Sequence, residues 1–206
     1  TSTDTLTATA SSIGDADGDS ITYAYAWFEN SVLSALIGST VPSSDLDVGE
    51  TWSVRVTAND GYVDGSFTEA SITVSNSNPV ISSLYISPNS SVYNDTVLTC
   101  TATATDADET VIPTVEWTVG ASTYTGASLD LSTTSAMPTD IITCTSTVTD
   151  SNGGTNSDST TVTVDNRAPS LTAVSISPNT GVLTNSTLTC SATVTDDDGE
   201  ILTQSY

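Results

Sequence analysis

The sequence contains no histidine and no lysine, and its basic residues are limited to Arg55 and Arg167. Against these two stand 25 acidic residues, which give a formal net charge of -23. A chain with so little positive charge cannot displace the counterions of a phosphate backbone, so nucleic-acid binding is excluded. The same shortage excludes attraction to anionic membrane surfaces, and the lack of histidine excludes a Ser-His-Asp triad and histidine metal sites.

Long apolar runs and helix-forming residues are also scarce. No apolar run approaches the roughly 18 residues of a membrane span, so we expect no direct membrane insertion. Serine and threonine together make up about a third of the chain. Because this composition favours strands and turns over helices, we expect an all-β protein.

The chain repeats itself every 90 residues, since the segment at 85–89 (YISPN) returns at 175–179 (SISPN) and 175 − 85 = 90. The block Leu-Thr-Cys at 98–100 likewise returns at 188–190, and Leu-Thr-Ala at 6–8 is a more diverged copy. A fixed period of this length indicates one folded domain per repeat, joined head to tail. The predicted domains are 1–76, which lacks its first strand, 77–166, which is complete, and 167–206, which begins a third.

The incomplete first and last copies allow two explanations. A longer parent protein is the simplest one. The other is a chain whose incomplete ends complement each other between subunits.

Period-two alternation with β-branched and aromatic residues predicts strands in both copies. Turn clusters such as 15–19, 60–61, 87–89 and 151–154 separate these strands. Several short strands within about 90 residues are typical of an antiparallel sandwich. The expected strands are 5–10, 20–28, 50–57 and 69–75 in the first copy, and 81–86, 97–105, 114–119, 141–149 and 160–164 in the second.

The cysteines and one tryptophan resemble a known arrangement. The order Cys100, Trp117, Cys144 is similar to the one with which immunoglobulin-like domains join their two sheets across the core. The resemblance implies a Cys100–Cys144 disulfide, with Cys190 left as a thiol, and hence an oxidising, extracellular setting. The alternative is three buried, reduced cysteines.

The resemblance to tandem immunoglobulin-like repeats covers the whole chain. It rests on Thr-Leu-Thr-Cys at 187–190, Asp-Ala-Asp-Gly-Asp at 15–19, Tyr-x-Tyr-x-Trp at 23–27 and Gly-Glu-Thr-Trp-x-Val at 49–54. Similar repeats, related in style to PKD and cadherin-like modules, occur in large secreted or surface-anchored bacterial proteins. The resemblance implies an all-β fold of tandem immunoglobulin-like antiparallel β-sandwich domains, located outside the cell or on its surface. In the first copy Ala8 and Val54 occupy the two cysteine positions, so packing alone must hold that domain.

Carboxylates at alternate positions of three equivalent loops suggest a site for a hard cation such as Ca²⁺, which takes six to eight oxygen ligands. We expect the second loop to gather with Asp150 beside Asn76 and Asn78, and the third to gather near Asp165 and Asn166. The alternative is that aspartate-rich turns simply give good turns and a soluble surface. The candidate ligands are Asp15, Asp17, Asp19, Asp106, Asp108, Glu109, Asp150, Asp196, Asp198 and Glu200.

Three sequons, at Asn89, Asn94 and Asn185, make glycosylation possible. Trp27, Trp52 and Trp117 are expected in the cores. Every acidic pair lies in a repeated loop or a turn, without a partner base or a unique pocket, so we expect no enzyme.

The predicted function is structural: a rod, stalk or filament of head-to-tail domains, in which copies of the chain assemble and calcium stiffens the junctions. One alternative is a carbohydrate- or protein-binding accessory or adhesin module of a larger secreted protein. A receptor-type adhesion ectodomain is a third possibility.

Overall fold

The computed structural model describes residues 1–11, 14–203 and 205. Within this part of the chain, the regular structure is β-strand apart from two 3-10 helices, Ser43–Asp45 (η1) and Leu131–Thr133 (η2). All strand pairings with a defined register are antiparallel. The expectation of an all-β protein with antiparallel sheets is therefore confirmed. The described residues include no helix with the length and apolar character that a membrane crossing needs.

Contacts divide the chain into two compact units, which are described one at a time. The first unit comprises Thr1–Val80, Ala104–Ile112 and Val148–Asn156. The second comprises Ile81–Thr103, Pro113–Thr147 and Ser157–Tyr206. The domain limits predicted from the repeat stay predictions. The acidic loops at 106–109 and 150–154 belong to the same unit as the linker at 75–79.

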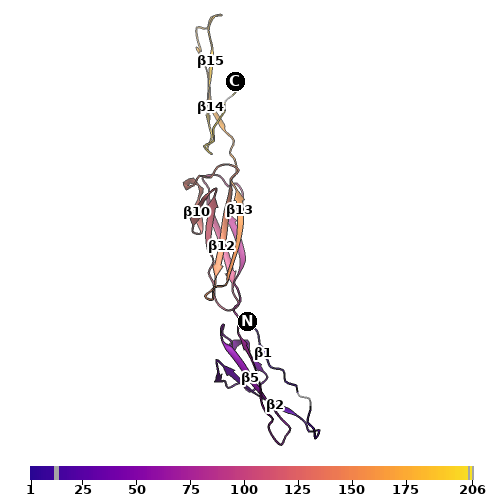
Figure 1. Cartoon of the computed structure of the whole chain (residues 1–206). Helices are drawn as coiled ribbons and strands as arrows, with labels where there is room; N and C mark the ends of the chain where they lie inside the picture. The colour runs from indigo at the N-terminus through magenta and orange to yellow at the C-terminus, as the bar shows by residue number, and fades with distance from the viewer. Residues whose placement is uncertain (12–13, 204, 206) are drawn as a thin grey trace. The chain divides into compact units, whose positions relative to one another are not determined.

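The first unit holds two sheets of residues 1–80, named here the first sandwich. A four-stranded sheet has the order β3-β2-β5-β6, and a two-stranded sheet pairs β1 with β4. The strands, labelled in part in Figure 1, are Leu6–Thr7 (β1), Thr22–Glu29 (β2), Val32–Leu33 (β3), Thr40–Val41 (β4), Thr51–Asn59 (β5) and Thr68–Thr73 (β6).

A tryptophan pair fills the centre of the first sandwich. Trp27 on β2 lies opposite Val54 on β5, and its ring meets that of Trp52 edge to face, with 6.4 Å between centroids. The indole N–H of Trp27 donates to the carbonyl of Gly38 at 2.9 Å, so burial leaves its polar atom satisfied. Val41 on β4 and Leu46, which follows η1, complete this core, which contains no disulfide.

The second unit holds a larger core, between a sheet of order β10-β9-β12-β13 and one of order β11-β8-β7. Both sheets contribute buried residues, as expected for a β-sandwich. In Figure 1 the strands of the four-stranded sheet run side by side. The strands are Val80–Ser87 (β7), Val97–Thr105 (β8), Thr114–Val119 (β9), Ser122–Thr125 (β10), Ser128–Asp130 (β11), Ile141–Thr149 (β12) and Thr155–Thr163 (β13).

A disulfide joins the two sheets of this core. It links Cys100 on β8 to Cys144 on β12, with 6.5 Å between the Cα atoms. Cys144 lies directly opposite Trp117, which is fully buried and donates from its indole N–H to the carbonyl of Gly126 at 3.0 Å. The predicted pairing is confirmed, and Cys190 is a free, exposed thiol as expected.

The end of the chain forms a two-stranded antiparallel sheet of Ser170–Ser177 (β14) and Thr189–Thr195 (β15). All eight residues of β14 are exposed. In register, Ile176 lies opposite Cys190 and Ser175 lies opposite Ser191.

Most predicted strands agree with the structure within two residues at each end, but two predictions were wrong. The first strand, expected at 5–10, is reduced to Leu6–Thr7, because β1 pairs only with β4 in the described part of the chain. The last strand of the second copy begins at Thr155 and not at 160, because polar residues at 155–159 pair with β12.

Candidate functional site

The three acidic loops share one local geometry. In each loop the first aspartate accepts a hydrogen bond from the backbone N–H two residues further on, which closes a tight turn. The donor–acceptor distances are 2.8 Å from Asp17 N to Asp15 Oδ1, 2.7 Å from Asp108 N to Asp106 Oδ1, and 2.9 Å from Asp198 N to Asp196 Oδ1. The turn therefore holds one oxygen of each first aspartate against the backbone of its own loop.

In the second loop, Asp108 anchors the linker that follows β6. The backbone N–H of Ser77 donates to Asp108 Oδ2 at 2.5 Å, and the hydroxyl of Ser2 donates to Oδ1. These hydrogen bonds, that of Ser2 first, lower the pKa of Asp108 against the opposing effect of its desolvation. The carboxylate is therefore held in its charged form by donors from the N-terminal segment and the linker.

Asp150, in the neighbouring loop, anchors the same linker from a second position. Its Oδ2 accepts from the side-chain amide of Asn76 at 2.8 Å, and its Oδ1 accepts from the backbone N–H groups of Gly154 and Asn152. The Asn76 amide is the main cause that lowers the pKa of Asp150. A Cβ on Gly154 would collide with the Asp150 carboxylate and lie 2.6 Å from Asn78 Oδ1, so only glycine fits there.

The expected gathering of Asp150 and the second loop beside Asn76 and Asn78 is thus found in the structure. Glu109 also takes part, since its Oε1 accepts from the backbone N–H of Ser151 at 2.5 Å.

Two oxygens in these loops, Asp106 Oδ2 and Asp196 Oδ2, and one in the linker, Asn76 Oδ1, are buried and lack a hydrogen-bond donor. The two aspartates are equivalent positions of the repeat, because 196 − 106 = 90. A buried oxygen without a donor is costly, and native structures usually provide such a group with a water or an ion. The same unsatisfied oxygen recurs in two equivalent loops, where a water or a cation would satisfy it.

The third loop gathers its carboxylates most closely. Asp196, Asp198 and Glu200 each offer an oxygen, and these oxygens all lie within 4.8 Å of one another. Asp198 is 1 % exposed, whereas Glu200 lies at the surface. Among the described residues, the loops of Asp15 and Asp106 do not reach this closeness. Among the described residues, the third loop is thus the one that brings three carboxylate oxygens close enough to hold a cation, fewer than the six to eight oxygens that Ca²⁺ takes.

An arginine also occupies the third loop. Arg167 donates from Nη1 to Asp198 Oδ1 at 2.9 Å and from Nη2 to Asp95 Oδ1 at 2.5 Å, and its backbone N–H donates to Asp198 Oδ2. Its guanidinium lies 4.1 Å from the ring centroid of Tyr93. Asp95, with a smaller contribution of Asp198, raises the pKa of Arg167. The sequence analysis did not predict the ion pair of Arg167 with Asp198. The available signal was the presence of an arginine in a linker of an otherwise acidic chain.

Asp165 and Asn166 were expected near the third loop, and the structure bears this out only in part. Asp165 accepts at Oδ2 from the backbone N–H of Val92, at 3.2 Å, and its side chain is used there. Asn166 is exposed. Arg167, one residue further along, makes the linker's contact with the loop, as Ser77 does in the second loop.

The sequons differ in accessibility. Asn89 and Asn185 are exposed. The Asn94 side-chain amide donates to the backbone carbonyl of Asp198 at 2.7 Å, so a glycan there would break this contact.

The chain shows no match to protein-family models and none to curated proteins.

Proposed function

We propose that the chain is a structural, extracellular repeat protein made of tandem immunoglobulin-like β-sandwich domains with a 90-residue period. The domains would join head to tail as a rod, stalk or filament, and copies of the chain would be its main partners. The disulfide supports a location in an oxidising compartment, outside the cell or at its surface.

The observation that carries this proposal is the way in which each linker is fastened to an acidic loop. Ser77 binds Asp108 through its backbone N–H, and Arg167 binds Asp198 in the same way, 90 residues later. A linker held at equivalent points in successive repeats limits the swing between domains, which a rod requires and a flexible spacer does not.

We further propose that a divalent cation, with Ca²⁺ as the physiological ion, binds at the loops and completes this fastening. The buried oxygens of Asp106 and Asp196 without donors support it, as does the close set of Asp196, Asp198 and Glu200. Carboxylate oxygens are ligands that Ca²⁺ prefers, and the single guanidinium of Arg167 does not balance the three carboxylates of the third loop.

The two tryptophans of the first sandwich give the binding-module alternative no support, although Tyr62 and Phe67 are exposed. Trp27 and Trp52 are 4 % and 2 % exposed and form part of the core, so they cannot stack on a sugar.

Negative-stain electron microscopy of the chain tests the proposal, first with calcium and then with excess chelator. We expect long, regular filaments or rods that loosen or bend after chelation. Filaments whose shape does not change after chelation would refute the role of the cation but would still support the structural function. Flexible monomers under both conditions would refute the structural function itself.

A further inference from the structure

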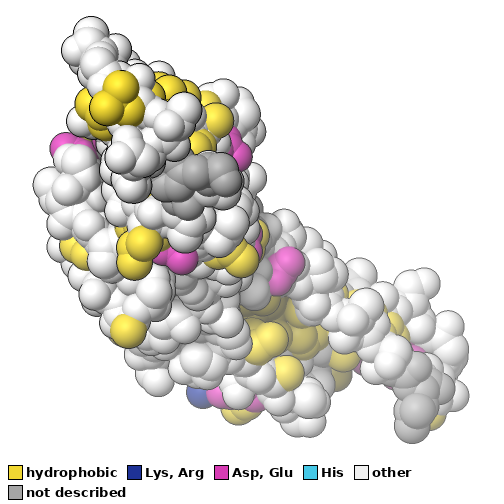
Figure 2. All heavy atoms as spheres, turned by 90° about the horizontal axis from the view of Figure 1, so that it is seen from above, with side chains coloured by type: hydrophobic (Ala, Val, Ile, Leu, Met, Phe, Trp, Pro, Cys, Tyr) yellow, Lys and Arg dark blue, Asp and Glu magenta, His cyan; other side chains and the backbone are white. Residues whose placement is uncertain are grey.

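Both arginines of the chain are stacked on aromatic rings. Arg167 lies over Tyr93 and donates from Nη1 and Nη2 to two aspartates, as described above. Arg55 contacts two rings, with its Cζ atom 4.6 Å from the ring centroid of Phe28 and 4.9 Å from that of Phe67. Figure 2 shows how scarce dark blue basic groups are on one face of this acidic chain. A guanidinium that is held against two rings loses little further freedom when it binds a partner.

Arg55 has a donor edge that is not used in the described part of the chain. Its Nε donates to Glu69 Oε2 at 2.7 Å, whereas neither Nη group has an acceptor among the described residues. Oε1 of Glu69 likewise receives no hydrogen bond from these residues. The two side chains are 45 % and 41 % exposed, so a partner can reach both free edges. The guanidinium can therefore bind one more carboxylate, and the carboxylate one more guanidinium.

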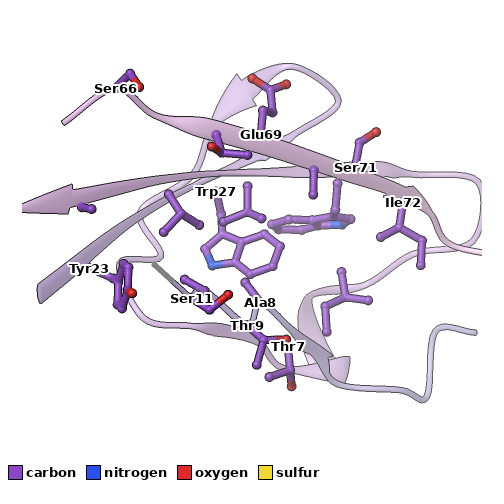
Figure 3. A pocket seen from close by; sticks show the side chains of 18 residues that line it. Thr7, Ala8, Thr9, Ser11, Tyr23, Trp27, Ser66, Glu69, Ser71 and Ile72 are labelled. Atoms are coloured by element: carbon purple, nitrogen blue, oxygen red, sulfur yellow. The ribbon is translucent and has the colours of Figure 1, made fainter. Parts of the chain in front are cut away.

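This ion pair lies on the outer face of the sheet β3-β2-β5-β6. In register, Arg55 on β5 is opposite Glu69 on β6 and Ala26 on β2. Figure 3 shows Glu69 and Ser71 on the side of β6 that points away from Trp27, which belongs to the core. The free edges of the ion pair therefore face outward from the first sandwich.

Apolar side chains border the ion pair on this face. Phe67 is 56 % exposed, and Leu33, which is opposite Phe28 in register, is 64 % exposed. We name the set of Phe28, Leu33, Arg55, Phe67 and Glu69 the Arg55 patch. Aromatic residues and arginine are the types that protein interfaces favour. The patch has no net charge in a chain of net charge -23, so two copies can approach there with little repulsion.

We propose that the Arg55 patch is a contact between two copies of the chain, related by a twofold axis. Arg55 of each copy donates through its Nη groups to Glu69 Oε1 of the other copy, so the same two residues serve both sides. The patch is self-complementary in this way because it carries one free donor edge and one free acceptor. Phe67 and Leu33 are covered in the same contact, which shields the two ion pairs from water and strengthens them. This contact goes beyond the head-to-tail assembly proposed above and does not depend on it.

Charge reversal followed by sedimentation velocity of the full chain, in excess chelator, tests the contact. The slowest-sedimenting species of the unmodified chain should be a dimer of 21.1-kDa copies. Arg55→Glu and Glu69→Arg should each raise the dissociation constant of this dimer on the order of 100-fold, because like charges then face one another. Head-to-tail filaments sediment far faster, so their presence or absence is measured separately from this contact.

An equimolar mixture of the Arg55→Glu and Glu69→Arg variants should recover the dimer, since each reversed charge then faces its opposite on the other copy. The ion pair within each chain stays broken in this mixture, so a role of Arg55 and Glu69 within one chain predicts no recovery. The fluorescence of Trp27 and Trp52 checks that each variant keeps its core.

The Arg55→Glu/Asp158→Arg variant is the matched control. It has the net charge of the unmodified chain, but its added positive charge lies on exposed β13, so it should remain monomeric. A dimer of this control would assign the association to bulk charge and would overturn the proposal. An unmodified chain that stays monomeric, or a mixture that does not recover the dimer, would also overturn it, and would leave the patch to a partner other than a second copy.

Discussion

Removal of the Cys100–Cys144 disulfide should destabilise the second core and leave the first sandwich unchanged. The bond closes a loop over a sequence separation of 44 residues. Loop-closure entropy then assigns it about 4 kcal/mol of stability at 25 °C, because the cross-link restricts the unfolded chain. At a urea m-value of about 1 kcal/mol/M, such a loss lowers the unfolding midpoint by roughly 4 M. The Cys100→Ala/Cys144→Ala variant avoids the ambiguity of incomplete reduction.

The tryptophans allow the two cores to be followed separately. Trp117 lies opposite Cys144, so a Trp27→Phe/Trp52→Phe background reports the second core alone. A Trp117→Phe background reports the first sandwich, whose own disulfide positions hold Ala8 and Val54 and which serves as the internal control. A loss below about 1 kcal/mol in the second core, or an equal loss in both cores, would refute the chain-entropy reasoning.

Three further predictions concern the acidic loops. Arg167→Ala should weaken protection of the third loop against hydrogen exchange about 30-fold, since a buried carboxylate left without its partner costs about 2 kcal/mol; unchanged exchange would contradict the role of this ion pair. Asp106→Asn should reduce calcium binding in calorimetry, whereas Asp158→Asn, with the same charge change on exposed β13, should not; equal losses would indicate bulk charge alone. The pKa of Asp108 is lowered in the folded chain, so its contribution to the free energy of unfolding is complete above pH about 4 and is lost as the pH falls through the lowered pKa. A pH titration that follows the amide NMR signal of Ser77 should therefore show loss of the Ser77–Asp108 hydrogen bond only in that acidic range. Loss of this hydrogen bond near neutral pH would contradict the prediction.

The alternation of residues was sufficient to predict the strands that lie inside the sheets. β8, β9 and β12 have the predicted bounds, because each has neighbours on both sides and one buried face. Pairing determined the remaining bounds: among the described residues β1 pairs with β4 alone and is short, and β13 is long because its polar start pairs with β12. The edge strands of two to four residues, β3, β4, β10 and β11, are too short for a period to be read.

The site was predictable where it depends on topology and not where it depends on individual side chains. Loops at one end of a sandwich meet its entering linker, which predicted the approach of Asp150 to Asn76. The contact of Ser2 with Asp108 and the position of Arg167 over Tyr93 depend on the conformations of individual side chains. No sequence period encodes such contacts.

Small-angle X-ray scattering of the monomeric chain, in calcium and then in excess chelator, tests the central claim most directly. If the linkers are fastened with the help of a cation, the scattering should fit one extended, rigid particle in calcium and a broader set of bent forms after chelation. The Asp106→Asn/Asp196→Asn variant should scatter in calcium as the unmodified chain does in chelator. Identical curves for the unmodified chain in both buffers would contradict cation-stiffened linkers.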